Sequence, residues 1–321
     1  MNSSRKTFTL IVALAILVLL LSFLFIATTT LLLGSLVEHK RDYVALIKLM
    51  GSIDYSSGGL FHQSGITPDH VKSYVEQVLS DPYAKAVVIE VNSPGGTTAA
   101  FEVYELIAKL SEERVVVVYI TGYGTSGGYL ISLPAHAIVA HPTALVGSVG
   151  AISVLISFSG LMNNLGINVE IIASGDLKDV ASPFRNITSK DIEFLSRIVN
   201  DVALYFSSLV KERRGDKIIY WNEVLRGGAY LATEAKRLGL VDYVGTLDDA
   251  IEIAKELAGL PKDAPVREFR KPLSLLELFL GSSHSNFMSS KNNIKSFEVL
   301  VMWPLSIEIP EAVIITKLPQ T

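Results

Sequence analysis

The clearest structural signal in this sequence is a strand that ends in a serine flanked by glycines. Residues 115–120 are apolar and mostly β-branched, which predicts a buried strand. The next stretch, Thr121-Gly-Tyr-Gly-Thr-Ser126-Gly-Gly-Tyr129, has glycines on both sides of Ser126 and leads into an apolar segment that could open a helix. Glycines permit a tight turn, and a helix start supplies free N–H groups. The turn therefore suits an acyl-transfer nucleophile, although a glycine turn with an incidental serine is the alternative.

A second glycine turn follows the preceding strand. Residues 86–91 predict that strand, Asn92-Ser-Pro-Gly-Gly96 the turn, and residues 97–110 a helix. Strands alternating with helices indicate an α/β domain with a largely parallel sheet, with further strands expected over residues 43–53, 137–140, 148–156 and 168–173. Both turns would then lie at the carboxyl edge of the sheet, where the N–H groups of Gly96 and Gly127 could face one carbonyl oxygen.

Histidine is one candidate for the general base. His136 and His141 lie downstream of Ser126 and would suit a Ser-His-Asp triad, although each position is also typical of a strand-end or surface histidine. The histidines are scattered and form no HExxH pair.

Lysine is the other candidate. Lys178 lies in a polar connection, residues 174–185, and a lysine can accept a proton when burial or a neighbouring cation lowers its pKa. The opposing hypothesis is a solvated lysine whose positive charge is held by Asp176 and Asp179.

Four motifs in this order resemble the signal peptide peptidase A family: residues 92–96, 122–129, 147–152 and 175–185. The resemblance extends from about residue 43 to residue 260 and implies a Ser–Lys peptidase with the Clp-protease/crotonase-like fold, a repeated ββα superhelix. The serine of the family's Ser-Gly-Gly-Tyr motif corresponds to Ser126, and the lysine of its Gly-x-x-Lys-Asp segment corresponds to Lys178. Asn92, Gly124 and His136 depart from the residues common in the family, but none belongs to this dyad. The family implies no cofactor and a homo-oligomeric ring with sites between protomers.

The N-terminal region predicts a membrane anchor. Residues 8–34 contain no charged residue and are mostly aliphatic, and ~20 such residues span a bilayer as a helix. A cleaved signal peptide, with an apolar region of ~7–15 residues, is the alternative that we disfavour. Basic residues flank the run about equally on its two sides, so charge alone leaves the orientation open. The short N-terminal tail and the family resemblance favour a cell-membrane protein with an extracytoplasmic catalytic domain.

The predicted organisation has four parts: an N-terminal tail over residues 1–7, the anchor over 8–34, a peptidase domain over 35–262 and an extension over 263–321. The extension contains a linker rich in Ser and Asn, residues 282–295, and an apolar tail, residues 297–317. Such a tail would be a poor exposed edge on a monomer, so we expect it to dock on a neighbouring copy.

Composition narrows the function further. The net charge of −4 argues against a nucleic-acid partner, and the lack of cysteine excludes disulfides, thiolate nucleophiles and cysteine metal sites. We therefore predict a membrane-anchored serine endopeptidase that degrades cleaved signal peptides and similar apolar segments. The alternatives are a related Ser–Lys protease acting on a membrane-protein tail, a non-catalytic membrane-tethered scaffold, and a crotonase-like acyl-CoA enzyme.

Overall fold

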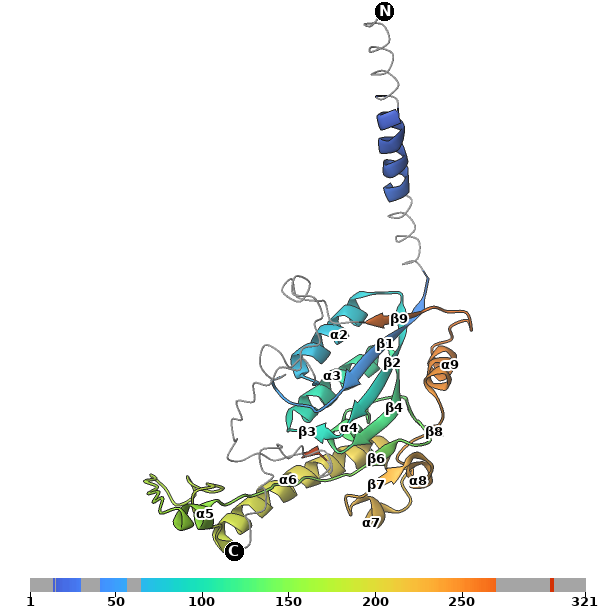
Figure 1. The fold of residues 1–321 in the computed structure, drawn as a ribbon. Coiled ribbons are helices and arrows are strands. Elements are labelled where there is room, and N and C mark those ends of the chain that lie inside the picture. The colour runs from blue at the N-terminus through green and yellow to red at the C-terminus, as the bar shows by residue number, and fades with distance from the viewer. Residues whose placement is uncertain (1–13, 15, 30–40, 57–64, 270–300, 303–321) are drawn as a thin grey trace, which may run out of the picture.

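The computed structural model describes residues 14, 16–29, 41–56, 65–269 and 301–302 (Figure 1). Residues 16–29 are helical and expose aliphatic and aromatic side chains such as Leu19 and Phe23. Within the described ranges, no helix combines the length and the apolar character needed to cross a membrane. The predicted anchor, residues 8–34, includes residues outside those ranges and stays a prediction.

The centre of the molecule is a mixed sheet of eight strands in the described chain. The strand order is β7-β6-β4-β2-β1-β9, with β5 beside β4 and β8 beside β5. Every pairing is parallel except that of β6 with β7. The strands are β1 (Tyr43–Met50), β2 (Ala84–Ser93), β4 (Val115–Thr125), β5 (Ala137–Ala140), β6 (Leu145–Gly147), β7 (Ala229–Leu231), β8 (Tyr243–Val244) and β9 (Val266–Phe269). The prediction of an α/β domain with a largely parallel sheet is confirmed.

Helices cover both faces of this sheet (Figure 1). On one face, Ala45 and Ile47 of β1 belong to a core shared with α2 (Pro68–Ser80) and α3 (Ala99–Glu113). On the other face, Val44 and Leu46 pack with α9 (Leu247–Leu257). Burial on both faces explains why the central strands are nearly continuous runs of aliphatic residues.

Two helix starts follow the capping chemistry that their sequences predict. The Thr67 side chain accepts a hydrogen bond from the His70 N–H at the start of α2. The long helix α6 (Ser189–Arg214) begins with a capping box between Thr188 and Asp191. The other helices of the described chain are shorter: α4 (Gly127–Leu130), α5 (Ser159–Asn164), α7 (Trp221–Val224) and α8 (Ala232–Arg237).

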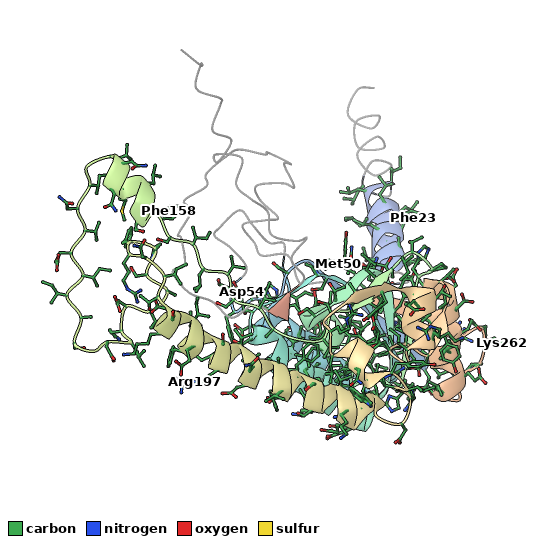
Figure 2. The ribbon with its side chains drawn as sticks, turned by 90° about the horizontal axis from the view of Figure 1, so that it is seen from below. Phe23, Met50, Asp54, Phe158, Arg197 and Lys262 are labelled. Carbon is green, nitrogen blue, oxygen red and sulfur yellow. The ribbon has the colours of Figure 1, made fainter. Side chains whose placement is uncertain are left out.

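Residues 151–188, here called the arm, extend away from the sheet (Figures 1 and 2). The strands predicted over residues 148–156 and 168–173 are wrong, because the arm contains only α5 and one isolated bridge residue. Many of its aliphatic side chains are exposed among the described residues: Ile172 is 96% exposed and Leu165 is 65% exposed. The aliphatic pattern that predicted the strands thus belongs to a solvent-exposed apolar surface.

Candidate functional site

Ser126 occupies a strained turn between β4 and α4. Its backbone has φ of 54° and ψ of −119°, a conformation that costs a non-glycine residue about 1–3 kcal/mol. The Ser126 N–H donates to the Gly147 carbonyl at 2.7 Å, and the Ser126 carbonyl accepts from the N–H groups of Tyr129 and Leu130 at 3.0 and 2.9 Å. Among the described residues, none forms a hydrogen bond with Ser126 Oγ. The backbone hydrogen bonds therefore keep Ser126 in its strained conformation, and they leave the Ser126 hydroxyl available for a substrate.

Close packing explains two of the glycines in the motifs. A Cβ at Gly128 would lie 2.3 Å from the Ser93 carbonyl oxygen, so α4 approaches the end of β2 without room for a side chain. A Cβ at Gly96 would lie 1.9 Å from the Ile53 carbonyl oxygen. Each glycine lets its turn sit directly against neighbouring backbone.

The two glycine turns lie at the same edge of the sheet, as predicted. Ser93 is the register partner of Gly124, and Thr125 Oγ1 donates to the Pro94 carbonyl at 3.2 Å. Gly96 belongs to the short strand β3 (Gly95–Gly96), which pairs antiparallel with β10 (Val301–Met302). Gly127 is the first residue of α4, so its N–H has no acceptor within that helix. The role of Gly96 and Gly127 as oxyanion donors stays a prediction.

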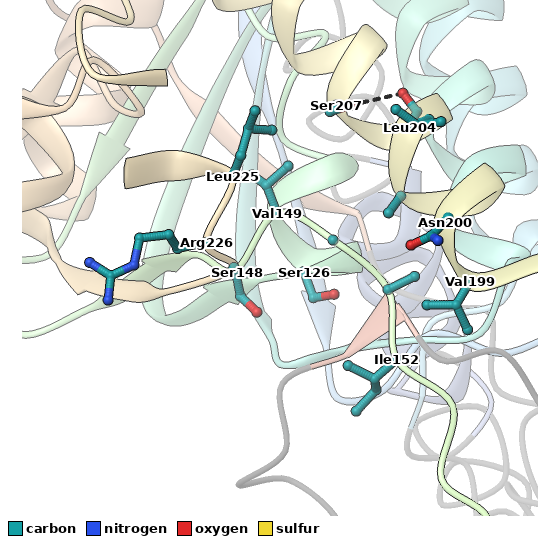
Figure 3. Close-up of a pocket in the computed structure, with 14 residues that line it drawn as sticks. Ser126, Ser148, Val149, Ile152, Val199, Asn200, Leu204, Ser207, Leu225 and Arg226 are labelled. Atoms are coloured by element: carbon teal, nitrogen blue, oxygen red, sulfur yellow. Dashed lines mark hydrogen bonds between the residues drawn. The ribbon is translucent and has the colours of Figure 1, made fainter. Parts of the chain in front are cut away.

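Ser126 opens into a pocket of about 640 Å³. Figure 3 shows Ser126 and Ser148 on one side of this pocket, facing Val199 and Asn200 of α6. Aliphatic side chains from three segments make up much of the lining: Val149, Ile152, Val199, Leu204 and Leu225. The pocket can therefore accept an apolar group next to the serine hydroxyl.

Ser148 is a pocket residue that the sequence analysis did not single out. Its φ is also 54°, and its N–H donates to the Gly228 carbonyl at 2.7 Å. The available signal was the sequence Gly147-Ser-Val-Gly150, one of the four family motifs. Neither the walls supplied by α6 nor those supplied by residues 225–227 had a recognisable signature.

Lys178 lies on the arm and is not among the residues that line the pocket. Its side chain is exposed, in a turn where its N–H donates to the Gly175 carbonyl at 3.1 Å. The structure of the single chain thus brings together Ser126, Gly96 and Gly127 but does not add Lys178 to them. The opposing hypothesis for Lys178 also fails in part, because Asp176 pairs with Lys190 and Asp179 pairs with Arg185.

The two candidate histidines are engaged elsewhere. His136 Nδ1 accepts from the Val116 N–H at 3.1 Å, and the His136 N–H donates to the Val116 carbonyl at 2.8 Å. His141 Nδ1 lies 2.8 Å from Thr143 Oγ1. Neither lines the pocket. In the part of the chain that the structure describes, no group of three His, Asp or Glu side chains could hold a metal ion.

Comparison with known proteins places the chain among peptidases. Residues 108–261 match the family model described as peptidase family S49. The chain is 36% identical over 247 residues to "Putative protease MJ0651" of Methanocaldococcus jannaschii, which covers 75% of this chain and 79% of that protein. It is 33% identical over 195 residues to "Protease 4" of Salmonella typhi, 60% of this chain and 31% of that one. It is 28% identical over 219 residues to "Putative signal peptide peptidase SppA" of Enterococcus faecium, 68% of this chain and 63% of that one. The chain therefore spans most of the first relative and about a third of the second.

Proposed function

The chain belongs to peptidase family S49, and from that membership we propose that it is a serine endopeptidase with a Ser126–Lys178 dyad. The observation that carries the proposal is the strained turn that presents Ser126 to an apolar pocket at the carboxyl edge of the sheet. Strained backbone persists where the surrounding structure enforces it, and such sites are often functional.

The proposed reaction follows the chemistry of acyl transfer. Ser126 Oγ attacks the peptide carbonyl carbon while its proton moves to the neutral amine of Lys178. The N–H groups of Gly96 and Gly127 stabilise the oxyanion, and the lysine ammonium then protonates the leaving amine. A water molecule, deprotonated in turn by Lys178, hydrolyses the acyl-enzyme and releases Ser126.

The pocket supports a preference for apolar peptides. Its lining would favour an aliphatic side chain beside the scissile bond, because burial of apolar surface contributes roughly 25 cal/mol per Å². Cleaved signal peptides and similar apolar segments are the proposed substrates, and the tail of a membrane protein is the second candidate. Such substrates suit an enzyme held at the membrane, so the proposal includes the anchor over residues 8–34 and an extracytoplasmic catalytic domain.

The exposed position of Lys178 is accommodated by assembly. We propose that the active form is a homo-oligomeric ring in which the arm of one copy brings Lys178 to Ser126 of its neighbour. The arm suits such a contact, because Ile172 and Leu165 would be covered by the neighbouring copy. The Clp-protease/crotonase-like superhelix belongs to the same proposal.

The test combines active-site labelling with peptide hydrolysis. A fluorophosphonate should label the wild-type protein but not Ser126→Ala, and both Ser126→Ala and Lys178→Ala should lose activity by roughly 10³-fold or more, as members of one catalytic unit do. The matched controls Ser208→Ala and Lys211→Ala change exposed residues of α6 and should keep labelling and turnover. Substantial turnover by a folded Lys178→Ala variant would overturn the dyad.

A further inference from the structure

Two carboxylates flank Lys178 in the sequence, and each is bound by a different cation. Asp176 precedes Lys178 by two residues and pairs with Lys190 of α6, whereas Asp179 follows it directly and pairs with Arg185. No carboxylate of a described residue lies within salt-bridge distance of Lys178 Nζ. Lys178, the one lysine of residues 151–188, thus has acidic neighbours in the sequence but no counter-ion among the described residues.

Arg185 is the centre of the larger network. Its Nε donates to Asp179 Oδ2 at 2.5 Å, and its Nη2 donates to the Asp179 carbonyl at 3.1 Å. Its Nη1 and Nη2 donate to the two carboxylate oxygens of Asp191 at 2.5 and 2.8 Å. The remaining Nη1 hydrogen points to the Asn186 carbonyl at 2.9 Å. A planar guanidinium can bind two carboxylates in this way, whereas a lysine ammonium cannot reproduce the geometry.

Asp191 connects this network to the wall of the pocket. It is buried near the start of α6 and accepts hydrogen bonds from Thr188 N and Thr188 Oγ1 at 2.8 and 2.9 Å. The same helix supplies Val199 and Asn200 to the pocket that contains Ser126. Ala181, inside the turn that Arg185 closes, has φ of 65°. A non-glycine residue in that region indicates a turn that its surroundings hold in one conformation.

We propose that Arg185 and Lys190 are positioning residues that bind Asp179 and Asp176 and thereby keep Lys178 available as a neutral base. This inference rests on the proposed dyad. A carboxylate within about 4–6 Å of an amine favours the protonated amine, which cannot accept the proton of Ser126. Pairing each carboxylate with another cation removes that effect without removing the acidic residues.

The ion pairs of Asp179 with Arg185 and of Asp176 with Lys190, here called the shield, persist over the pH range in which a lysine acts as a base. The Arg185 guanidinium holds the pKa of Asp179 and of Asp191 below the ordinary range, and Lys190 does the same for the pKa of Asp176. These carboxylates therefore stay ionised and bound to their cations at neutral and alkaline pH. Besides Lys178, the charged residues between positions 151 and 193 are Glu170, Asp176, Asp179, Arg185, Lys190, Asp191 and Glu193.

The test is the pH dependence of kcat/KM in the full-length protein. Arg185→Gln frees Asp179. The rise of kcat/KM with pH that reports deprotonation of Lys178, here called the alkaline limb, should therefore move to higher pH by about one unit. One unit is the smaller end of the pKa shift that a nearby opposite charge causes. Lys190→Met frees Asp176, whose pairing is exposed to solvent, so the limb should move in the same direction by less and return toward the wild-type position in high salt. The matched control Lys211→Met, on α6, should leave the limb in place.

Removal of the Asp179 charge distinguishes the shield from a purely structural role, in which Arg185 only holds the turn in place, here called a clamp. If the shield is the role of Arg185, adding Asp179→Asn to Arg185→Gln should restore the wild-type limb, because no carboxylate remains to hold Lys178. A clamp would gain nothing from that second change. Should Arg185→Gln fail to fold because Asp191 is left unpaired, the exposed pair decides the question through Lys190→Met and its rescue by Asp176→Asn.

A second readout separates this inference from the dyad itself. The acetylation rate of Lys178 by acetic anhydride, followed by mass spectrometry across pH, reports the neutral amine without any turnover. We expect its pH profile to move with the alkaline limb in both variants. Unmoved profiles would overturn the shield while leaving the dyad intact, whereas full turnover by Lys178→Ala would overturn the dyad first.

Discussion

Arg214, at the end of α6, is buried, and its charge is balanced by Asp242. Its Nη1 donates to Asp242 Oδ2 at 2.8 Å, while its Nε and Nη2 donate to the Gly239 carbonyl at 3.0 and 2.7 Å. Asp242 Oδ2 also accepts from the Ile138 N–H of β5 at 2.9 Å, and Asp242 Oδ1 accepts from Lys217 at 2.6 Å. This carboxylate thus ties the end of α6 to the sheet, at the opposite end of the helix from Asp191.

The Asp242 carboxylate makes the free energy of unfolding depend on pH in the acid range. Burial acts to raise its pKa, but the hydrogen bond and charge of Arg214, together with Lys217, outweigh burial and hold the pKa below its ordinary value. A lowered pKa in the folded state stabilises the fold above the unfolded value of about 3.9, and that contribution is lost as the pH falls below it. We expect Asp242→Asn to lower the free energy of unfolding at pH 7 by about 3 kcal/mol, the loss typical of a broken buried pair, and to weaken its acid dependence.

Urea unfolding at pH 7 and across the acid range measures both effects. Asp216→Asn, which removes an exposed carboxylate from the same region, is the matched control and should change the midpoint little. A midpoint for Asp242→Asn equal to that of the wild type would show that Arg214 does not need this partner.

The packing of α4 on the end of β2 sets the position of Ser126, the proposed nucleophile. Gly128→Ala would place a Cβ 2.3 Å from the Ser93 carbonyl oxygen, which is backbone and cannot rotate aside. We expect a loss of stability of about 1–3 kcal/mol from overpacking. Displacement of Ser126 by even 1 Å should lower kcat by roughly 10²-fold. Thermal unfolding and peptide hydrolysis measure the two effects.

Gly160→Ala is the control for a glycine with free space around it. Gly160 lies in α5, and an added Cβ there would meet nothing within 4 Å. The same substitution should therefore leave stability nearly unchanged. If Gly128→Ala were equally harmless, the close approach of α4 to β2 would not be what positions Ser126.

The elements differ in how far the sequence predicts them. The runs in β2 and β4 predict strands because burial on both faces demands aliphatic residues throughout. The arm has the same kind of composition, but a strand also needs a partner, and composition does not say whether one exists. The start of α6 at Thr188 is visible in the sequence, because the capping box of Thr188 and Asp191 is a local interaction.

The candidate site is predictable to the extent that the sheet positions it. Both glycine turns follow adjacent parallel strands. Because the carboxyl ends of parallel strands lie at one edge of the sheet, Ser126 and Gly96 come together. The direction of the arm follows from no such rule, and the structure leaves Lys178 outside the pocket. The α6 wall was missed because amphipathic spacing is the same whether a helix face covers a core or lines a pocket.

Two residues of the C-terminal tail, 301–302, pair with β3 of the same chain. Docking of the tail on a neighbouring copy stays a prediction. The rest of the predicted tail lies outside the described residues. The strand β10 therefore lies beside Gly96, so the tail and the candidate site share one edge of the fold.

The arm leads to a prediction about how complete sites form. Ser126 opens into the pocket of the main body, whereas Lys178 is exposed on a segment that extends away from it (Figure 1). If each site takes its serine from one copy and its lysine from the next, two inactive variants can complement each other. After Ser126→Ala and Lys178→Ala are mixed in equal amounts and reassembled, about a quarter of the sites in a symmetric oligomer would hold both wild-type groups.

We therefore expect peptide hydrolysis to return to about a quarter of the wild-type rate after mild dissociation and reassembly of the mixture, with each variant alone remaining inactive. The double variant Ser126→Ala/Lys178→Ala, mixed with either single variant, is the control, because neither mixture supplies both groups. A dyad within one copy predicts no recovery in any mixture. Sedimentation of the same samples must show mixed oligomers, since recovery depends on contact between copies. An oligomer that forms and stays inactive would place Lys178 beside Ser126 of its own chain and make the arm a structural element only.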